Sequence, residues 1–363
     1  MLDLGEQIEQ LWPELEKAMR EVLRSGRFIL GPEVEAFERE CASYLGCAHA
    51  IGVGSGHEAL VIALRAADVG PGDEVITTPF TFFSTGEAIL EVGATPVFAD
   101  IEPDSFCLDP ESALAALTPR TRAFLPVHLY GAAADLAPLL EVCAQRGLKL
   151  IEDTAQAFGS TCAGQRLGTL GSAGTFSFFP SKILGAFGDA GVIATNDATL
   201  AEQVRLLRHH GQRDRYTQVR TGKTGRLDEL QAALLRVKLP YVERWNARRR
   251  AIAERYRSLL AGVPELVLPA ARPDVEHCYN YFTLRILGGR RDALQQELGK
   301  RGVGTAVYYP QPLHQSSLYT ARAVQLPHAE RAAAEVLSLP IWPEMPDAAI
   351  ERVAHEVRSA LAE

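Results

Sequence analysis

A single lysine in a glycine-rich loop is the residue of this sequence with the clearest chemical potential. Lys182 follows the apolar run from Thr175 to Phe179 and a proline, within the stretch GTFSFFPSKILGAFGDAG. The apolar run predicts a buried strand that ends just before the loop. Burial disfavours the charged ammonium, so it lowers the pKa of the lysine and makes the amine nucleophilic. We therefore expect Lys182 to form a Schiff base, the alternative being a solvated loop lysine.

A glycine-rich turn far upstream could hold a phosphate. The sequence IGVGSGHE runs from Ile51 to Glu58, after a predicted strand and at the start of a predicted helix. Main-chain N–H groups and the helix dipole bind phosphate at such a place. A dinucleotide fingerprint would need a third glycine where His57 stands. The turn thus favours a single phosphate, the alternative being an ordinary tight turn.

Two acidic residues end another apolar run. The segment LKLIEDTAQA, residues 148–157, places Glu152 and Asp153 at the end of a predicted central strand, with Gln156 three residues after Asp153. Open α/β sheets bind ligands at this end of their strands, although strand-end acids also cap helices. Lys182 follows Asp153 by 29 residues. A phosphate turn, a strand-end aspartate and a strand-end lysine are together what pyridoxal phosphate (PLP) requires.

Each of these groups would meet a different part of that cofactor. The turn anchors the phosphate, Asp153 keeps the pyridine nitrogen protonated, and Lys182 binds the aldehyde. Phe82, in PFTFFST, is a candidate to lie on the ring, although the adjacent pair Phe82 and Phe83 also suits a core. Ser177, in the strand before Lys182, is a candidate to bind the phosphate.

The elements that must position these residues follow an alternating pattern. Short apolar runs alternate with helical patterns, which predicts a mostly parallel sheet covered on both faces. The expected strands are residues 50–53, 74–77, 96–99, 122–127, 149–152, 175–179 and 192–195. After a long helical region over 227–260 the pattern changes. We predict a large domain over residues 1–240 and a smaller α+β domain over residues 241–363.

Three segments outside this pattern carry expectations of their own. Apolar spacing from Ile8 to Val22 predicts an amphipathic helix, with Pro13 in its first turn and Gly26 as its stop. The polar loop over 211–225 suits a surface or an interface. The run Arg248 to Arg250 lies on a helical segment, where charge runs indicate a solvated face.

Composition excludes several classes of function. With 45 acidic and 37 basic residues the net charge is -8, so nucleic acid and anionic membranes are not expected partners. The six cysteines form no CxxC pair and no zinc-type spacing, which predicts reduced thiols and no metal site. The N-terminus lacks the basic and apolar pattern of a leader, and no stretch of 18 apolar residues occurs. We expect a soluble cytoplasmic protein.

Longer blocks resemble the DegT/DnrJ/EryC1/StrS family of sugar aminotransferases, among the fold-type I PLP enzymes. The resemblance runs from SGRFILGPEV to TAVYYPQPLH, and its blocks are GPGDEVITTPFTFFSTGEAI, PVFADIEPDSFCLDP, PVHLYG, IEDTAQAFGS, FSFFPSKILGAFGDAG and GRLDELQAALLRVKL. It implies the fold-type I α/β architecture and a homodimer whose subunits share active sites.

The resemblance also implies a role for each matching residue. Lys182 would bind PLP covalently, Asp153 would meet the pyridine nitrogen, and Gln156 would lie near the ring hydroxyl. The other implied contacts are Phe82 on the ring, Ser55, Gly56, His57 and Ser177 at the phosphate, Thr224 of the partner at the phosphate, and Arg226 and Tyr309 at the substrate.

Two positions depart from the family pattern. Thr224 stands where the family usually has asparagine, and His57 stands where threonine or serine is common. A threonine hydroxyl still donates one hydrogen bond, so we expect weaker cofactor binding without loss of function.

The implied activity is transamination of a keto sugar linked to a nucleoside diphosphate, with glutamate as amino donor. The product would be an amino sugar for a glycan or a secondary metabolite. GQRDRYTQVR and the turn from Tyr308 to Pro310 resemble family members that aminate 3-keto sugars more than those of the 4-amino branch, which implies a ketone at carbon 3. One alternative is a PLP-dependent sugar dehydratase, which would have histidine in place of Lys182. The other is a regulatory protein that keeps the fold without turnover.

Overall fold

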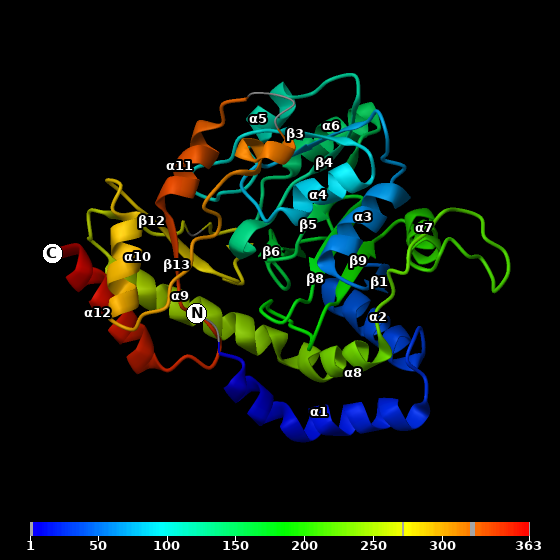
Figure 1. Cartoon of the computed structure of the whole chain (residues 1–363), viewed down its shortest axis with the longest axis horizontal. Coiled ribbons are helices and arrows are strands. Elements are labelled where there is room, and N and C mark those ends of the chain that lie inside the picture. The colour runs from blue at the N-terminus through cyan, green and yellow to red at the C-terminus, as the bar shows by residue number, and fades with distance from the viewer. Residues whose placement is uncertain (1–2, 271, 320–323, 363) are drawn as a thin grey trace.

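A seven-stranded sheet forms the centre of the computed structural model, which describes residues 3–270, 272–319 and 324–362 (Figure 1). Within that sheet β9 alone runs antiparallel to its neighbours, so the predicted mostly parallel α/β sheet is confirmed. The strand order is β1 (His49–Val53), β9 (Gly191–Thr195), β8 (Ala173–Ser177), β5 (Lys149–Asp153), β4 (Thr121–Leu125), β2 (Glu74–Thr77) and β3 (Thr95–Phe98).

Helices cover this sheet and extend beyond it. They are α1 (Gly5–Ser25), α2 (Pro32–Leu45), α3 (Gly56–Ala66), α4 (Ser84–Glu91), α5 (Pro110–Ala115), α6 (Ala137–Arg146), α7 (Ala198–Arg208), α8 (Glu229–Lys238), α9 (Val242–Leu260), α10 (Arg291–Lys300), α11 (Pro327–Glu335) and α12 (Asp347–Ala362). Short 3-10 helices span Leu129–Gly131, Leu239–Tyr241, Leu313–Gln315 and Ser317–Tyr319. No helix among the described ranges has the length and apolar character needed to span a bilayer.

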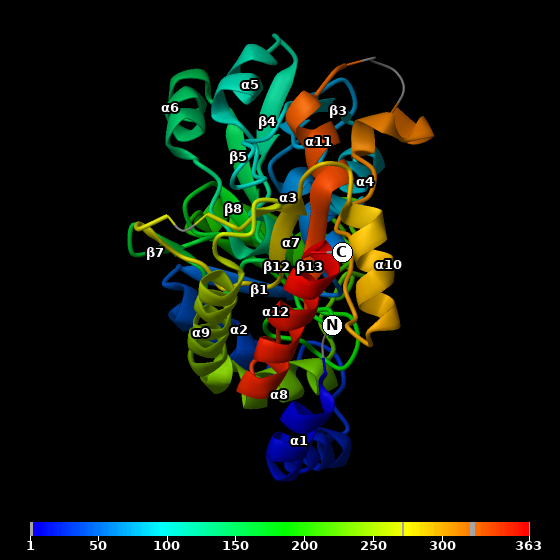
Figure 2. The same cartoon turned by 90° about the vertical axis from the view of Figure 1, so that its left-hand side faces the viewer.

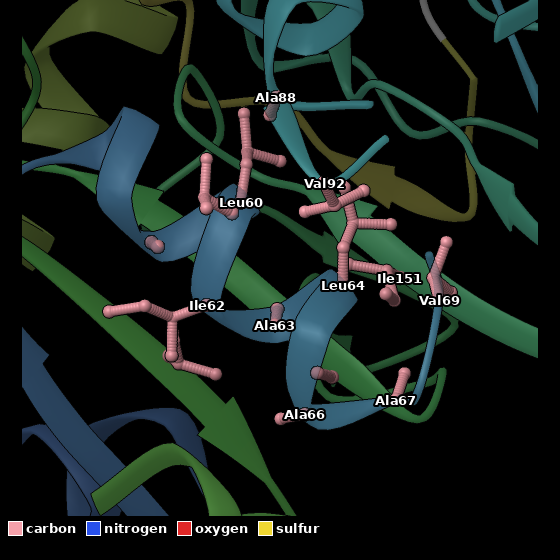
Figure 3. Packing of buried hydrophobic residues seen from close by; sticks show 14 of the residues in the cluster. Leu60, Ile62, Ala63, Leu64, Ala66, Ala67, Val69, Ala88, Val92 and Ile151 are labelled. Atoms are coloured by element: carbon pink, nitrogen blue, oxygen red, sulfur yellow. The ribbon is translucent and has the colours of Figure 1, made fainter. Parts of the chain in front are cut away.

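Helix α3 is the element most tightly held against the sheet. Its residues 59–64 are all buried, and it packs on β8, β9, α4 and α7. Figure 3 shows Leu60 and Leu64 among Ala88, Val92 and Ile151. Each buried leucine or isoleucine side chain contributes about 2 kcal/mol. This packing fixes the N-terminus of α3 at the end of β1.

The first helix forms as predicted but begins earlier. It starts at Gly5 and ends at Ser25, and the following Gly26 has the left-handed conformation expected of a C-cap. Pro13 therefore lies inside the helix and not in its first turn, which corrects that expectation. The apolar face of α1, with Leu11 and Leu15 buried, packs on α8 (Figure 1).

The C-terminal part of the chain has a core of its own. Buried residues between Ile252 and Leu361 form one cluster, and α9 packs against α12 (Figure 2). A small antiparallel sheet joins β10 (Leu266–Val267), β12 (Phe282–Ile286) and β13 (Val336–Leu339), and another joins β11 (Val275–Glu276), β6 (Thr161–Cys162) and β7 (Gln165–Arg166). The division of domains near residue 240 stays a prediction.

The arginine run on α9 is not a solvated face, contrary to the prediction. Arg249 is 3% exposed and donates hydrogen bonds to the carbonyls of Tyr279 and Ile341. Arg248 and Arg250 are only half-buried. Adjacent residues on a helix point in different directions, so one member of the run faces the C-terminal core while its neighbours lie beside it.

Candidate active site

Most of the predicted site residues line one cavity of about 490 Å³. They come from segments far apart in the sequence, which meet at the carboxyl end of the parallel strands. The residues brought together are Ser55, Gly56, His57, Phe82, Asp153, Gln156, Ser177, Lys182 and Tyr309. Ligands bind at this edge in open α/β sheets, so the position agrees with a cofactor site.

Lys182 lies in a tight loop that follows β8. Its main-chain N–H donates to the carbonyl of Phe179 at 2.8 Å, and the N–H of Ala186 donates to the carbonyl of Phe178 at 2.7 Å. A Cβ on Gly185 would lie 2.2 Å from the carbonyl oxygen of Pro180, so this loop requires glycine there. Burial lowers the pKa of Lys182 to about 8, although the charge of Asp153 opposes the shift. The amine is therefore much more nucleophilic than that of an exposed lysine.

Asp153, the last residue of β5, is buried and held in place by two donors. Thr85 Oγ1 donates to Oδ2 at 2.8 Å, and the N–H of Ala155 donates to Oδ1 at 3.2 Å. Burial raises the pKa of Asp153, whereas these hydrogen bonds and the charge of Lys182 lower it. A buried carboxylate with both oxygens fixed is suited to stabilise a cation inside the cavity.

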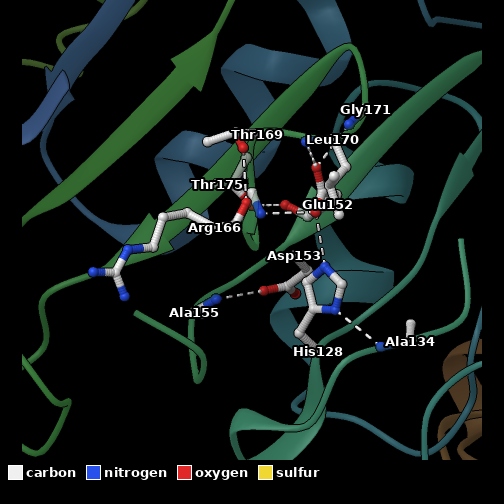
Figure 4. Close-up of polar contacts among 11 residues, drawn as sticks. His128, Ala134, Glu152, Asp153, Ala155, Arg166, Thr169, Leu170, Gly171 and Thr175 are labelled. Carbon is white, nitrogen blue, oxygen red and sulfur yellow. Dashed lines mark hydrogen bonds and ion pairs between the residues drawn. The ribbon is translucent and has the colours of Figure 1, made fainter. Parts of the chain in front are cut away.

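The neighbouring acid, Glu152, points to the other face of the sheet and has a structural role (Figure 4). Its Oε2 accepts from His128 Nε2 at 2.9 Å and from the N–H of Gly168 at 2.7 Å. Its Oε1 accepts from the N–H groups of Leu170 and Gly171, both at 2.8 Å. The carboxylate of Glu152 thus fastens the segment before β8 to the end of β5.

Gln156 connects the cavity to an aromatic wall. Its Oε1 accepts from the main-chain N–H of Tyr130 at 2.8 Å, and its Nε2 donates to the hydroxyl of Tyr309 at 2.9 Å. Both interactions hold the carboxamide in one orientation. Gln156 and Tyr309 are therefore positioned as a pair.

The start of α3 and the end of β8 form a narrow cradle. Ser55 caps α3, and its hydroxyl accepts from the N–H of Glu58 at 3.0 Å. A Cβ on Gly56 would lie 2.5 Å from Ser177 Cβ, so only glycine allows this close approach. Ser177 lines the same cavity as Gly56 and His57 at the start of α3. The first N–H groups of a helix lack partners within it and are free to bind a ligand. This cradle fits a phosphate group.

Phe82 lies at the mouth of the cavity. It is 43% exposed, with its ring centroid 3.9 Å from that of Phe83 and 6.1 Å from that of Tyr309. An exposed aromatic ring at a cavity mouth can stack on a planar ligand. The cradle, the held carboxylate of Asp153 and the half-buried amine of Lys182 thus fit PLP at its phosphate, its ring nitrogen and its aldehyde.

Thr224 and Arg226 do not line the cavity in this chain. Thr224 is exposed, with its hydroxyl 3.3 Å from His210 Nε2. One guanidinium nitrogen of Arg226 lies 3.3 Å from His209 Nδ1. Their predicted roles in a partner's site stay predictions.

Sequence reasoning missed several partners of the site. Thr85, 68 residues before Asp153, donates to it, and Tyr130 orients Gln156 through its main chain. Thr85 lies within a block that resembles the family, but a threonine in an apolar helix does not by itself predict a contact with a distant carboxylate. A main-chain donor such as that of Tyr130 leaves no mark in the sequence.

A family model described as the DegT/DnrJ/EryC1/StrS aminotransferase family matches residues 10–358 of the chain. The chain belongs to this family. It is 46% identical over 360 residues to the dTDP-3-amino-3,4,6-trideoxy-alpha-D-glucose transaminase of Streptomyces venezuelae, covering 98% of this chain and 94% of that protein. A pleiotropic regulatory protein of Geobacillus stearothermophilus is 47% identical over 362 residues, covering 98% and 97%.

Solved structures of the DegT/DnrJ/EryC1/StrS family share the whole fold. The structure of S. venezuelae DesV in complex with a ketimine intermediate has a TM-score of 0.96 and 45% identity, covering 99% of this chain and 98% of that one. The chain is thus a PLP-dependent aminotransferase of fold-type I, as the sequence predicted.

Proposed function

We propose that this enzyme transfers an amino group from glutamate to a keto sugar linked to a nucleoside diphosphate. The observation that carries the proposal is the single cavity in which Lys182, Asp153 and the phosphate cradle at Ser55 meet. The transaminase of S. venezuelae, named for a dTDP-linked amino sugar, supports the substrate class. Lys182 argues against the dehydratase alternative, and the intact set of Lys182, Asp153 and Gln156 argues against a purely regulatory protein.

PLP, when bound, supplies a ring that withdraws electrons from the substrate carbon. The carboxylate of Asp153, which is buried and held by Thr85, would stabilise a positive charge on the ring nitrogen. Lys182 Nζ removes and returns the proton at the substrate carbon, a task that its lowered pKa of about 8 suits. Gln156 and Tyr309 orient the ligand from the facing wall.

The carbon that receives the amino group is proposed to be carbon 3. The name of the S. venezuelae relative places its amino group there, and the resemblance of residues 211–220 and 308–310 to family members that aminate 3-keto sugars supports the same position. The proposed location is the cytoplasm, as expected from the sequence.

The active enzyme is proposed to be a homodimer. Thr224 and Arg226 lie outside the cavity of their own chain, so a role at a cofactor or substrate requires a second subunit. Arginine suits this role because its planar guanidinium binds carboxylate and phosphate in a bidentate way.

The direct test is turnover with a panel of sugars. Purified enzyme is incubated with glutamate and with dTDP-, UDP- and GDP-linked 3-keto and 4-keto sugars, and 2-oxoglutarate is measured. We expect production with at least one 3-keto sugar and a rate at least tenfold lower with its 4-keto isomer. Equal or faster turnover of 4-keto sugars would contradict the carbon-3 assignment. Cofactor uptake without turnover of any sugar would favour the regulatory alternative.

A further inference from the structure

A second cavity lies beside the first and is larger, with a volume of about 680 Å³. One wall comes from residues 102–106 after β3 and residues 130–133 after β4. The facing wall comes from α9 and from residues 275–283. Tyr281 lines both cavities, but none of the residues assigned above to the cofactor lines the second one. Its volume is typical of small-molecule sites.

Aromatic side chains form much of the lining. Phe106, Tyr130 and Tyr279 all line the cavity, and their φ angles of 59°, 60° and 48° place them in the left-handed region. This conformation costs about 1 kcal/mol or more for a residue with a side chain, and such residues cluster at ligand sites. His277 stacks on Tyr279 with ring centroids 4.0 Å apart. Phe106, Tyr130 and Tyr279 are only 5%, 3% and 6% exposed. The half-buried rings of His277 and Tyr281, which also line the cavity, are therefore the ones that a planar ligand can reach.

Two arginines of α9 face the same space. Arg250 and Arg257 are seven residues apart, so they lie on one face of the helix, two turns from each other. Arg257 is fixed, because it donates to the carbonyl of Pro269 at 2.8 Å and to the hydroxyl of Tyr279 at 2.7 Å. Arg250 is half-buried and has no hydrogen bond or ion pair to any residue that the structure describes. Its guanidinium is available for an anionic ligand.

Another donor comes from His277. Its Nδ1 accepts from the main-chain N–H of Tyr279 at 2.8 Å, and burial lowers the pKa of His277 to about 3. The ring is therefore neutral and carries its proton on Nε2, which has no partner within the described ranges. A neutral donor suits a carbonyl or hydroxyl of a ligand.

Acidic residues also reach this cavity, and they restrict how an anion could lie. Glu102 and Asp104 belong to the loop after β3, where Glu102 accepts from the hydroxyl of Ser105. Glu254 lies 3.7 Å from Arg257 and is exposed. A phosphate near the β3 loop would be repelled, whereas one at Arg250 would be attracted.

We propose that this cavity binds a nucleoside phosphate, with the phosphate at Arg250 and the base against the aromatic wall. A single small ring would leave most of the volume unfilled, whereas a nucleoside phosphate combines a planar ring, a polar sugar and an anion. Bases stack readily on aromatic side chains, and arginine binds phosphate through paired hydrogen bonds. The proposal does not depend on which sugar the enzyme aminates.

Ligand binding in the second cavity would change the positions of residues that line the catalytic cavity. The wall between the two contains Tyr130 and Tyr281: the hydroxyl of Tyr130 donates to the carbonyl of Tyr308, and the ring of Tyr281 stacks on that of Tyr308 at 4.2 Å. The main-chain N–H of Tyr130 also holds Gln156. A nucleotide that contacts Tyr130 and Tyr281 would therefore shift the surroundings of the cofactor.

Equilibrium dialysis of labelled UDP and dTDP against the PLP-loaded protein tests the site without turnover. The variant is Arg250→Ala, and the matched control is Arg255→Ala, which removes an exposed arginine of the same helix paired with Glu351. We expect wild type and Arg255→Ala to bind the nucleotide at this site with equal affinity. In Arg250→Ala the affinity should fall roughly tenfold to hundredfold, the usual effect of losing a charged hydrogen bond. The nucleotide should also shift the cofactor absorbance of wild type but not of Arg250→Ala.

A second variant fills the cavity from the opposite wall without changing charge. Ala132→Phe should remove the same class of sites, while cofactor content and circular dichroism report whether each variant is folded. Nucleotide binding that neither variant changes would place the nucleotide in the catalytic cavity and overturn the proposal. Absence of binding to wild type at millimolar nucleotide would overturn it too.

Discussion

Burial moves Lys182 and Asp153 toward their neutral forms, and their mutual attraction opposes both shifts. The pKa of Lys182 falls to about 8, and that of Asp153 rises. The two effects have different uses, since a neutral amine is a nucleophile and a carboxylate stabilises a cation. Thr85 and the N–H of Ala155 donate to Asp153 and favour its charged form.

The lowered pKa of Lys182 predicts how the protein takes up its cofactor. Only the neutral amine attacks the aldehyde, so below pH 8 the rate of covalent PLP uptake by cofactor-free protein should fall about tenfold per pH unit. Above pH 8 the rate should level off. Stopped-flow absorbance measures this rate, and Lys300→Ala, which removes an exposed lysine, serves as the control. A rate that still rises steeply at pH 10 would show an unshifted lysine.

Which residues sequence reasoning could find depends on how local their signals are. An apolar run precedes each of the predicted site elements, which are Lys182, Asp153 and the turn at Ser55. Glycine or proline often marks where such a run ends. Thr85 bonds to Asp153, 68 residues away, and His128 bonds to Glu152, 24 residues away. No pattern in the neighbouring sequence predicts either contact.

At the scale of elements, long periodic segments were predictable and short ones were not. The helix predicted from the apolar spacing of Ile8 to Val22 agrees with α1 to within a few residues, because its apolar residues recur with helical spacing. Two-residue strands such as β6 and β10 are too short to show any periodicity. The long helical region over 227–260 is divided into α8 and α9 at Leu239–Tyr241, where Pro240 lies.

The segment 221–226 can be tested for a role in the active site of the partner subunit. If Arg226 serves the partner's cavity, a mixture of Lys182→Ala and Arg226→Ala chains contains hybrid dimers with one intact site. Each homodimer should be nearly inactive, and mixing after dissociation should restore up to about a quarter of wild-type activity, because random pairing makes half of the dimers hybrid. Arg255→Ala in place of Arg226→Ala is the control. Full activity of a monomer at nanomolar dilution would contradict a shared site.

At the scale of the whole molecule, the order of the strands was beyond sequence reasoning. The alternating pattern indicated a mostly parallel sheet, but pairings such as β1 with β9 join residues about 140 positions apart. The resemblance to the family supplied the fold-type I architecture that periodicity alone did not. The arginine run was misjudged for a similar reason: helical spacing tells which residues share a face, but not which other elements cover that face.

Borohydride trapping tests the central claim most directly, namely that this fold brings Lys182 to PLP for amino transfer. Borohydride reduces the bond between lysine and PLP, and peptide mass spectrometry then locates the label. We predict the label on the peptide that contains Lys182, little label after prior incubation with glutamate, and amino transfer reduced by at least roughly a hundredfold in Lys182→Ala. A label on a different lysine, or full activity of Lys182→Ala, would contradict the account.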